Sequence, residues 1–154
     1  MYNFAMQHRK GVAAEQMLDD YFAKWFDIRP ASMLQQRIGI DRIFTDRRDG
    51  RVMTVEYKAD FVAQRTGNAF VETVSVDTKD TAGWAYTSAA NYLIYYIEGD
   101  ELVYVFDFAQ FREQLDTWQR NYPTRRIPNE GYRTHGLLVP LREFEKYSEA
   151  QLSV

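Results

Sequence analysis

The sequence predicts an α/β or α+β fold in which helices flank a mixed β-sheet. Three observations support this prediction: an amphipathic segment near the N-terminus, several short segments rich in β-branched and aromatic residues, and a second helical segment after them. The chain has 154 residues, of which 45% are hydrophobic and 16% aromatic. These values fit one well-packed core, so we expect a single domain over residues 1–154.

The composition argues against several classes of protein. The chain contains no cysteine, so it has no disulfide and no thiolate metal site. It lacks an apolar run of about 18 residues, which argues against a transmembrane helix. Its N-terminus also lacks the long apolar core of a signal peptide. We therefore expect a cytoplasmic protein without membrane contact.

The first helix is predicted over residues 8–26, where apolar side chains recur at helical spacing. These side chains are Ala14, Met17, Leu18, Tyr21, Phe22 and Trp25. Glu15 falls beside Phe22, at the edge of the apolar stripe. The segment 27–32, which contains a proline, is expected to end the helix.

Three strands are predicted next, over residues 34–46, 51–58 and 69–76. The first two flank the sequence DRRDG, in which Asp49 and Gly50 form a strong turn signal. We expect these two strands to pair as a β-hairpin.

The middle of the chain predicts a short helix and two further strands. Residues 77–89 are expected to form a loop followed by the short helix. The segment NYLIYYI is apolar on both faces, which is typical of a central, fully buried strand. A turn over residues 98–100 then leads into the strand ELVYVF.

The last part of the chain begins with a helix predicted over residues 108–120, which Asp107 and Gln110 are expected to cap. The segment 121–136 is expected to be mostly loop. The sequence LLVPL predicts a short last strand that its proline interrupts. We expect the polar tail, residues 142–154, to be helical or frayed.

The hairpin carries the residues with the clearest chemical potential. Side chains alternate between the two faces of a strand, so Glu56 and Lys58 point the same way from the otherwise apolar sequence RVMTVEYK. Pairing of the two strands is expected to bring Asp41 beside Glu56. Two neighbouring carboxylates repel each other unless a cation lies between them.

A hard divalent cation fits such a pair, because Mg²⁺ takes oxygen ligands from one or two carboxylates together with water and substrate phosphate. The carbonyl of Tyr57 is a candidate third ligand. The Lys58 ammonium would then lie near the attacking water or the scissile phosphate. There it would help to deprotonate or orient the water and offset developing negative charge.

These residues resemble the signature of the PD-(D/E)XK nuclease superfamily, which has the restriction-endonuclease-like fold. Its motif is an acidic residue on one strand of a hairpin, followed on the next strand by Glu or Asp, any residue and Lys. Here the matching residues are Asp41 and Glu56-Tyr57-Lys58, although Ile40 stands where a proline precedes the acid in the named motif. The core order α-β-β-β-α-β of that fold also matches the predicted elements.

Two subgroups of the superfamily share further features with this chain. Many members, including Holliday-junction resolvases, add a glutamate from the first helix, which Glu15 matches. The stretch from VEYKAD through RTGNAFVETVSV to GWAYTSAANYLIYYI is similar to a group of phage-type nuclease-like proteins. Together these resemblances cover about residues 8–108.

The resemblance implies a metal-dependent nuclease that hydrolyses phosphodiester bonds of DNA with Mg²⁺ or Mn²⁺. Asp41 and Glu56 would bind the metal together with the Tyr57 carbonyl, Lys58 would position water, and Glu15 would bind a second metal or a metal-bound water. Members that cut duplex or branched DNA are often dimers, which implies a homodimer. Branched, phage or mobile-element DNA is the candidate substrate.

Contacts to the DNA are predicted for Arg42, Arg65 and Asn68. Arg42 and Arg65 belong to a group of basic residues between positions 37 and 65, and the sequence TGN at 66–68 is a candidate phosphate nest. The net charge of −3 counts against a general nucleic-acid coat, but an acidic protein can still present one basic face. Solvated charge on the hairpin and a plain turn at 66–68 stay open as alternatives.

Other interpretations also stay open. Glu56 and Lys58 would in the simplest case form a surface ion pair, with Asp41 as a strand-start residue. Glu72 would extend the metal site, bind Lys58, or mark a solvent-facing edge. A second hypothesis for the whole chain is a non-catalytic nucleic-acid- or protein-binding module on the same fold. A structural partner in a phage or mobile-element system, with exposed aromatic side chains as its interface, is the third possibility.

Overall fold

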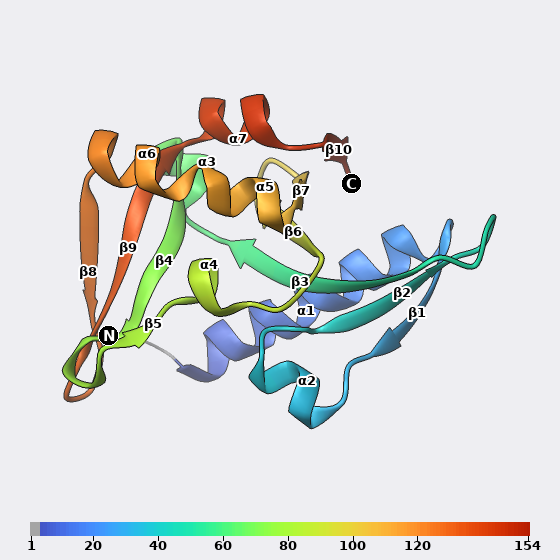
Figure 1. Cartoon of the computed structure of the whole chain (residues 1–154), viewed down its shortest axis with the longest axis horizontal. Coiled ribbons are helices and arrows are strands. Elements are labelled where there is room, and N and C mark those ends of the chain that lie inside the picture. Colours follow the sequence, from blue (N-terminus) through green and yellow to red (C-terminus); the bar gives the residue numbers. More distant parts are fainter. Residues whose placement is uncertain (1–3) are drawn as a thin grey trace.

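The computed structural model describes residues 4–154 and contains two β-sheets with helices on both sides (Figure 1). The larger sheet has six strands in the order β1-β2-β3-β6-β7-β10, and the smaller has four in the order β5-β4-β9-β8. Strands β3 and β6 are parallel, whereas the other paired strands are antiparallel. The predicted mixed α/β architecture is confirmed.

The strands of the six-stranded sheet are β1 Phe26–Pro30, β2 Arg42–Asp46, β3 Val52–Asp60, β6 Tyr92–Ile97, β7 Leu102–Asp107 and β10 Ala150–Ser153. Those of the four-stranded sheet are β4 Asn68–Val76, β5 Thr81–Ala82, β8 Thr124–Pro128 and β9 Arg133–Pro140. The helices are α1 Phe4–Phe22, α2 Met33–Arg37, α3 Ala63–Thr66, α4 Trp84–Thr87, α5 Phe108–Glu113, α6 Leu115–Asn121 and α7 Leu141–Tyr147, with a 3-10 turn, η1, at Asp77–Lys79.

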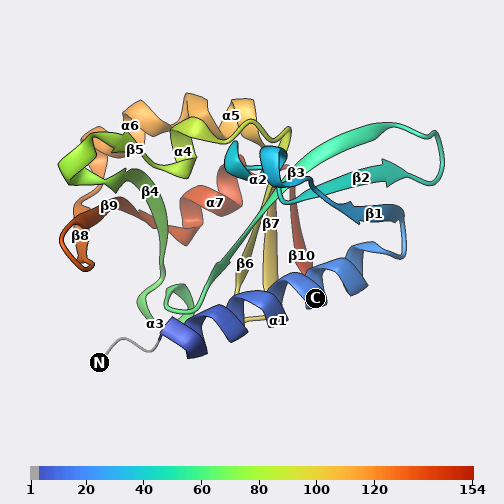
Figure 2. The ribbon, with the colours of Figure 1, turned by 90° about the horizontal axis from the view of Figure 1, so that it is seen from below.

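Helices cover both faces of the six-stranded sheet. Helix α1 lies along one face, and α5, α6 and α7 lie on the other side (Figure 2). The apolar side chains of α1, among them Leu18 and Phe22, pack against Phe44 and Tyr57 of the hairpin. On the other side Phe111 and Phe144 belong to a second buried cluster, which also includes strands of the four-stranded sheet.

Strand β6 lies in the middle of the six-stranded sheet, between β3 and β7, as the sequence NYLIYYI predicts. Its pairing with β3 runs from Val55 opposite Tyr92 to Asp60 opposite Ile97. A strand covered on both faces needs apolar residues at successive positions, which explains the uninterrupted apolar sequence.

The hairpin of β2 and β3 is also present. Gly50 has a positive φ of 74°, which the turn between the strands requires and which glycine adopts without steric cost. Strand β3 extends to Asp60, two residues beyond the predicted end. Asp107 caps α5 as predicted, accepting hydrogen bonds from the amides of Ala109 and Gln110. The helical segment after it is divided into α5 and α6.

The prediction that residues 27–32 end the first helix is wrong in its details. Helix α1 ends at Phe22, and residues 26–30 form β1, which pairs with β2. Pro30 lies at the last position of this edge strand, where the sheet tolerates a residue without an N–H donor.

The prediction of a strand from residue 34 is wrong for its first part. Residues 33–37 form the short helix α2, because Ser32 and Gln35 make a capping box. The Ser32 hydroxyl accepts from the Gln35 amide at 3.2 Å, and the Gln35 side chain accepts from the Ser32 amide at 2.9 Å.

The C-terminal third is more regular than its polar sequence predicts. Residues 121–136, expected to be loop, contain β8 and the start of β9, joined by a turn at which Gly131 has a φ of 83°. The short last strand is part of β9, which ends at Pro140. The tail forms α7 and then β10, which pairs with β7. In residues 4–154 no helix has the length and apolar character needed to cross a membrane.

Candidate active site

Asp41 lies just before β2 and holds the backbone of β3 on both sides of Glu56. Its amide donates to the Val55 carbonyl at 2.8 Å, and its Oδ2 accepts from the Tyr57 amide at 2.8 Å. Asp41 therefore takes the place that a further residue of β2 would occupy in the ladder. The structure brings Asp41 next to Glu56.

Glu56 is almost completely buried, with 5% of its side chain exposed. Its Oε1 lies 3.1 Å from Nζ of Lys58, but its Oε2 has no hydrogen-bond partner. This Oε2 is the one buried side-chain polar atom without a partner among residues 4–154. The nearby Ser88 hydroxyl does not satisfy it, because its single proton is donated to the Gly39 carbonyl at 2.8 Å.

Burial raises the pKa of Glu56 above its usual range. The Lys58 charge opposes this shift, whereas the Asp41 carboxylate adds to it. The direction of the net shift shows that the surrounding protein does not fully compensate a charge on Glu56. An additional cation at Oε2 would do so.

Lys58 lies beside Glu56 on the same face of β3, as strand alternation predicts. Its side chain is 33% exposed, and Nζ lies 5.5 Å from the centre of the Trp84 ring. Its charge also acts on Glu72 of β4, where it opposes the rise in pKa that burial causes. Lys58 is thus held near two carboxylates and an aromatic ring.

Glu72 is half-buried and reaches the N-terminal end of α4, where its Oε1 accepts from the Trp84 amide at 3.3 Å. Gly83 makes this approach possible, because a Cβ atom there would lie 2.4 Å from the Glu72 carbonyl oxygen. Of the open interpretations of Glu72, its position fits an interaction with Lys58 rather than a solvent-facing edge.

Glu15 lies on the other side of β3, on α1. Its Oε2 is 3.5 Å from the Arg42 guanidinium, which also bonds Asp19 at 3.0 Å and the Asp41 carbonyl at 3.0 Å. Burial raises the pKa of Glu15; Arg42 opposes the shift and Asp41 adds to it. Glu15 and Asp41 are therefore close enough to influence each other.

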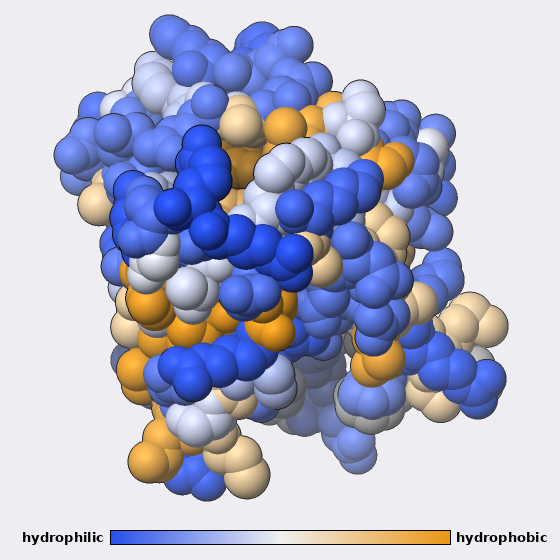
Figure 3. Space-filling model, turned by 90° about the vertical axis from the view of Figure 1, so that its right-hand side faces the viewer, coloured by the Kyte–Doolittle hydropathy of each residue, from blue (hydrophilic) through white to orange (hydrophobic). Residues whose placement is uncertain are grey.

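Arg42, a predicted DNA contact, is 16% exposed and bound to the carboxylates of α1. A phosphate would have to displace these carboxylates to reach it. Other arginines of the predicted basic face lie at the end of the hairpin. There Arg47 pairs with Asp27 at 3.2 Å and Arg48 with Asp46 at 3.0 Å. The surface on that side of the molecule is mostly hydrophilic, with small hydrophobic areas between (Figure 3).

The other two predicted DNA contacts flank the C-terminus of α3. Arg65 is exposed, and Asn68 is half-buried at the start of β4. The amides of the TGN sequence already have partners: Gly67 donates to the Ala63 carbonyl at 2.7 Å and Asn68 to the Thr66 hydroxyl at 3.2 Å. The segment is therefore a helix C-cap and turn rather than an open phosphate nest.

The Tyr57 carbonyl faces the edge of β3 at which Asp41 lies. The carbonyls of Thr54 and Asp60 accept from Asn91 and Glu98 on the β6 side. Backbone groups of successive residues point to opposite edges of a strand, so the carbonyl of Tyr57 points away from β6, like its amide. The donor set at this place is two carboxylates and one carbonyl.

This donor set fits a hard cation that keeps much of its water. Within residues 4–154 no three or more His, Cys, Asp or Glu side chains are grouped closely enough to hold a metal. Mg²⁺ is commonly held by one or two carboxylates, with water and substrate oxygens completing the octahedron. The unpartnered Oε2 of Glu56, beside Asp41, supplies the oxygen that such an ion requires.

Two neighbours of the site were missed by sequence reasoning. Asp19 lies four residues after Glu15, a spacing that places both carboxylates on one face of a helix and was a usable signal. Ser88 gave no signal, because only the tertiary structure brings it near Glu56 and Gly39.

Comparison with known proteins gives little further information. No family model matches the chain, and no curated protein matches it. Among solved structures, the chain is similar to a bacterial homing endonuclease, I-Ssp6803I, with 19% sequence identity and a TM-score of 0.47. The match covers 90% of this chain and 77% of the homing endonuclease.

Proposed function

We propose that this chain is a metal-dependent nuclease that hydrolyses phosphodiester bonds of DNA. The observation that carries the proposal is the buried Glu56 Oε2, which lacks a partner although Asp41 and Lys58 are adjacent. A buried carboxylate oxygen without a hydrogen bond is costly, and natural proteins keep such groups mainly where function needs them.

Mg²⁺ or Mn²⁺ is the proposed cofactor, with Asp41, Glu56 and the Tyr57 carbonyl as ligands. When bound, the ion supplies Lewis-acid stabilisation of the phosphate and lowers the pKa of a coordinated water. Its charge would also stabilise the ionised form of Glu56, whose pKa the neighbouring Asp41 carboxylate helps to raise.

Lys58 is the proposed catalytic cation. Its ammonium lies at the rim of the site, partly exposed, where it orients the attacking water and offsets negative charge on the phosphate. Glu56 and Glu72 hold it in this position. Glu15, near Asp41, is the proposed holder of a second metal or of a water.

Membership of the PD-(D/E)XK superfamily is part of the proposal. It is supported by the hairpin, which places an acid before one strand and Glu-x-Lys on one face of the next, with a glutamate of the first helix close by. A homodimer acting on branched, phage or mobile-element DNA in the cytoplasm is the corresponding expectation.

A titration of Mn²⁺ by calorimetry tests the metal site. The wild type is expected to bind saturably, and the double variant Asp41→Ala, Glu56→Ala is expected not to bind. The matched control is Asp27→Ala, Glu113→Ala, which removes the same charge from two exposed positions and should bind like the wild type. The titration is repeated with a non-cleavable DNA analogue, because substrate phosphate completes many such sites.

Cleavage of DNA in Mg²⁺ or Mn²⁺ tests the role of Lys58. Lys58→Ala should slow cleavage by about 10²–10⁴-fold while Mn²⁺ binding persists. An unchanged cleavage rate in Lys58→Ala would refute the proposed role. No metal binding in the wild type, with or without DNA, would favour a non-catalytic binding module.

A further inference from the structure

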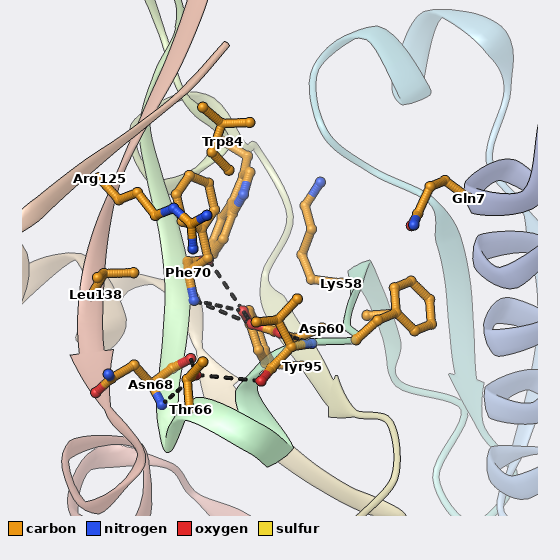
Figure 4. Close-up of a pocket in the computed structure, with 14 residues that line it drawn as sticks. Gln7, Lys58, Asp60, Thr66, Asn68, Phe70, Trp84, Tyr95, Arg125 and Leu138 are labelled. Carbon is orange, nitrogen blue, oxygen red and sulfur yellow. Dashed lines mark hydrogen bonds between the residues drawn. The ribbon is translucent and has the colours of Figure 1, made fainter. Parts of the chain in front are cut away.

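A pocket of about 400 Å³ opens directly beside Lys58. It lies between the end of β3, the face of the four-stranded sheet and the N-terminal end of α1 (Figure 4). Lys58 belongs both to this pocket and to the candidate active site. A group bound in the pocket would therefore lie next to the phosphate that the site is proposed to cleave.

Two aromatic rings in the pocket wall, those of Phe70 and Trp84, are held in fixed positions. The Phe70 ring lies over Gly136 of β9, where an added Cβ atom would be 2.3 Å from the ring. The Trp84 ring is stacked on Phe111, with 5.8 Å between ring centres and 29° between planes. These rings form a rigid apolar surface that needs no ordering when a ligand binds.

The polar groups at the pocket favour an anionic ligand with hydrogen-bonding edges. Arg125 is exposed and has no hydrogen bond or ion pair to any of residues 4–154 that would neutralise it. The acid in the wall, Asp60, is satisfied internally by the amides of Val62 and Ala63 and by the Tyr95 hydroxyl. The side-chain amide of Asn68 is a further donor and acceptor at the wall.

We propose that this pocket receives a single nucleobase that has left the duplex stack. The preferred substrate is then a DNA strand with an unpaired nucleotide beside the scissile phosphate, as in a single strand, a flap or a frayed end. The inference rests on the proposed nuclease function and deepens it by naming the substrate class.

The chemistry of a nucleotide matches each part of the pocket. Its planar base stacks on the fixed ring of Phe70, as every base can regardless of sequence, while the Trp84 ring, stacked on Phe111 with Lys58 over it, completes the wall. Its polar edge meets the Asn68 amide, and the phosphates on either side meet Lys58 and Arg125. A phosphate alone would leave the apolar wall unused, and an apolar compound would leave both cations unused.

A base that remains paired and stacked does not present its face to a protein, so it cannot use this pocket. A strand with its phosphate at Lys58 fills the pocket only when the neighbouring nucleotide is unpaired. Pockets of this size, about 300–1,000 Å³, are typical of sites for small organic ligands.

Binding of short DNA strands without metal tests the inference. Three probes of equal length, about 12 nucleotides, are compared in EDTA: a single strand, the same strand without any bases, and a duplex. The wild type should bind the intact single strand roughly 5- to 150-fold more tightly than the abasic strand, which retains every phosphate. The intact single strand should also bind more tightly than the duplex.

The variant Phe70→Leu removes one aromatic face and keeps an apolar side chain. It should lose most of the preference for the intact strand and bind the abasic strand like the wild type. The matched control is Trp25→Leu, which removes an exposed aromatic ring from the turn between α1 and β1, away from the pocket, and should keep the preference. If Phe70→Leu does not fold, the comparison of intact and abasic strands in the wild type decides alone.

Equal affinity of the wild type for the intact and the abasic strand would overturn the inference. Lys58→Ala separates it from the proposed function, because this variant should lose cleavage and keep the preference for bases. Base-dependent binding without cleavage by the wild type would support the pocket and refute the nuclease. Cleavage without any base dependence would refute the pocket and leave the nuclease.

Discussion

The two faces of β3 carry similar charged groups but differ in how well those groups are satisfied. On the α1 face, Asp19 accepts from both the Arg42 guanidinium and the Tyr57 hydroxyl, and burial with Asp19 beside it raises the pKa of Tyr57. On the opposite face, Glu56 has one oxygen paired with Lys58 and the other without a partner. The network under α1 is complete, and the network around Glu56 is not.

The difference separates a structural role from a functional one. The hydrogen bonds among Asp19, Arg42 and Tyr57 fix α1 on the hairpin and leave none of these three groups in need of a ligand. An incomplete network costs stability, because folding removes Oε2 of Glu56 from water without giving it a hydrogen-bond partner. We infer that Glu56 is kept for binding and Asp19 for folding. Substitutions on each face test this division.

Glu56→Gln should have the largest effect and move activity and stability in opposite directions. Cleavage should fall at least about 100-fold, because a neutral amide is a poor ligand for Mg²⁺ and a poor partner for Lys58. The free energy of unfolding at neutral pH should rise by roughly 1–3 kcal/mol, the usual cost of an unsatisfied buried polar group. A variant that is less stable than the wild type at neutral pH would contradict the comparison.

The gain in stability should depend on pH. Burial raises the pKa of Glu56 in the folded state above its value of 4.5 when unperturbed. The wild type therefore has its full stability below the unfolded pKa of Glu56, where the side chain is neutral in both states. It loses stability as the pH rises through the raised folded pKa, because the buried side chain must then ionise. Urea unfolding without metal should show the difference between Glu56→Gln and wild type growing from acidic to neutral pH.

Asp19→Asn should have an intermediate effect, confined to stability. Arg42 is 16% exposed and would lose the charged partner of its Nε, which should cost about 1–3 kcal/mol in urea unfolding. The affinity for Mn²⁺ should stay within roughly threefold of the wild type, since the proposed ligands remain. Asp20→Asn, at the exposed neighbouring position, is the control and should change stability by less than about 0.5 kcal/mol.

Arg47→Ala should have the smallest effect. Arg47 and Asp27 are 53% and 73% exposed and 3.2 Å apart, and exposed pairs of this kind contribute about 0–1 kcal/mol. Urea unfolding should therefore show a loss below that limit, and salt should reduce it further. A larger loss would mean that charge removal alone, rather than the state of each network, explains the other two variants.

The sequence was most informative where local pattern and chemistry agreed. The turn at Gly50, the alternation along β3 and the uninterrupted apolar sequence of β6 each depend on neighbouring residues, and each predicted its element. The same alternation predicted that Glu56 and Lys58 share a face, and their side chains are in contact.

The sequence was least informative where distant pairing decides the structure. Strands β1, β8 and β10 have polar or proline-containing sequences and exist because each pairs with a strand elsewhere. Likewise, the sequence left three alternatives open for Glu72, of which a place near Lys58 was one, and no local pattern indicates that Ser88 lies near Glu56. The hairpin half of the candidate site was predictable, and the half supplied by β4 and α4 was not.

The parallel pairing of β3 with β6 also sets the order in which the site assembles during folding. The contact from Asp41 to the Tyr57 amide closes a loop of 16 residues within the hairpin and forms early. The approach of Glu72 requires β4 to pair with β9 in the four-stranded sheet, and the approach of Ser88 requires β6 to pair with β3. Contacts between residues this far apart in the sequence form slowly. We expect the newly made chain to acquire its hairpin first and a working centre only at the end of folding.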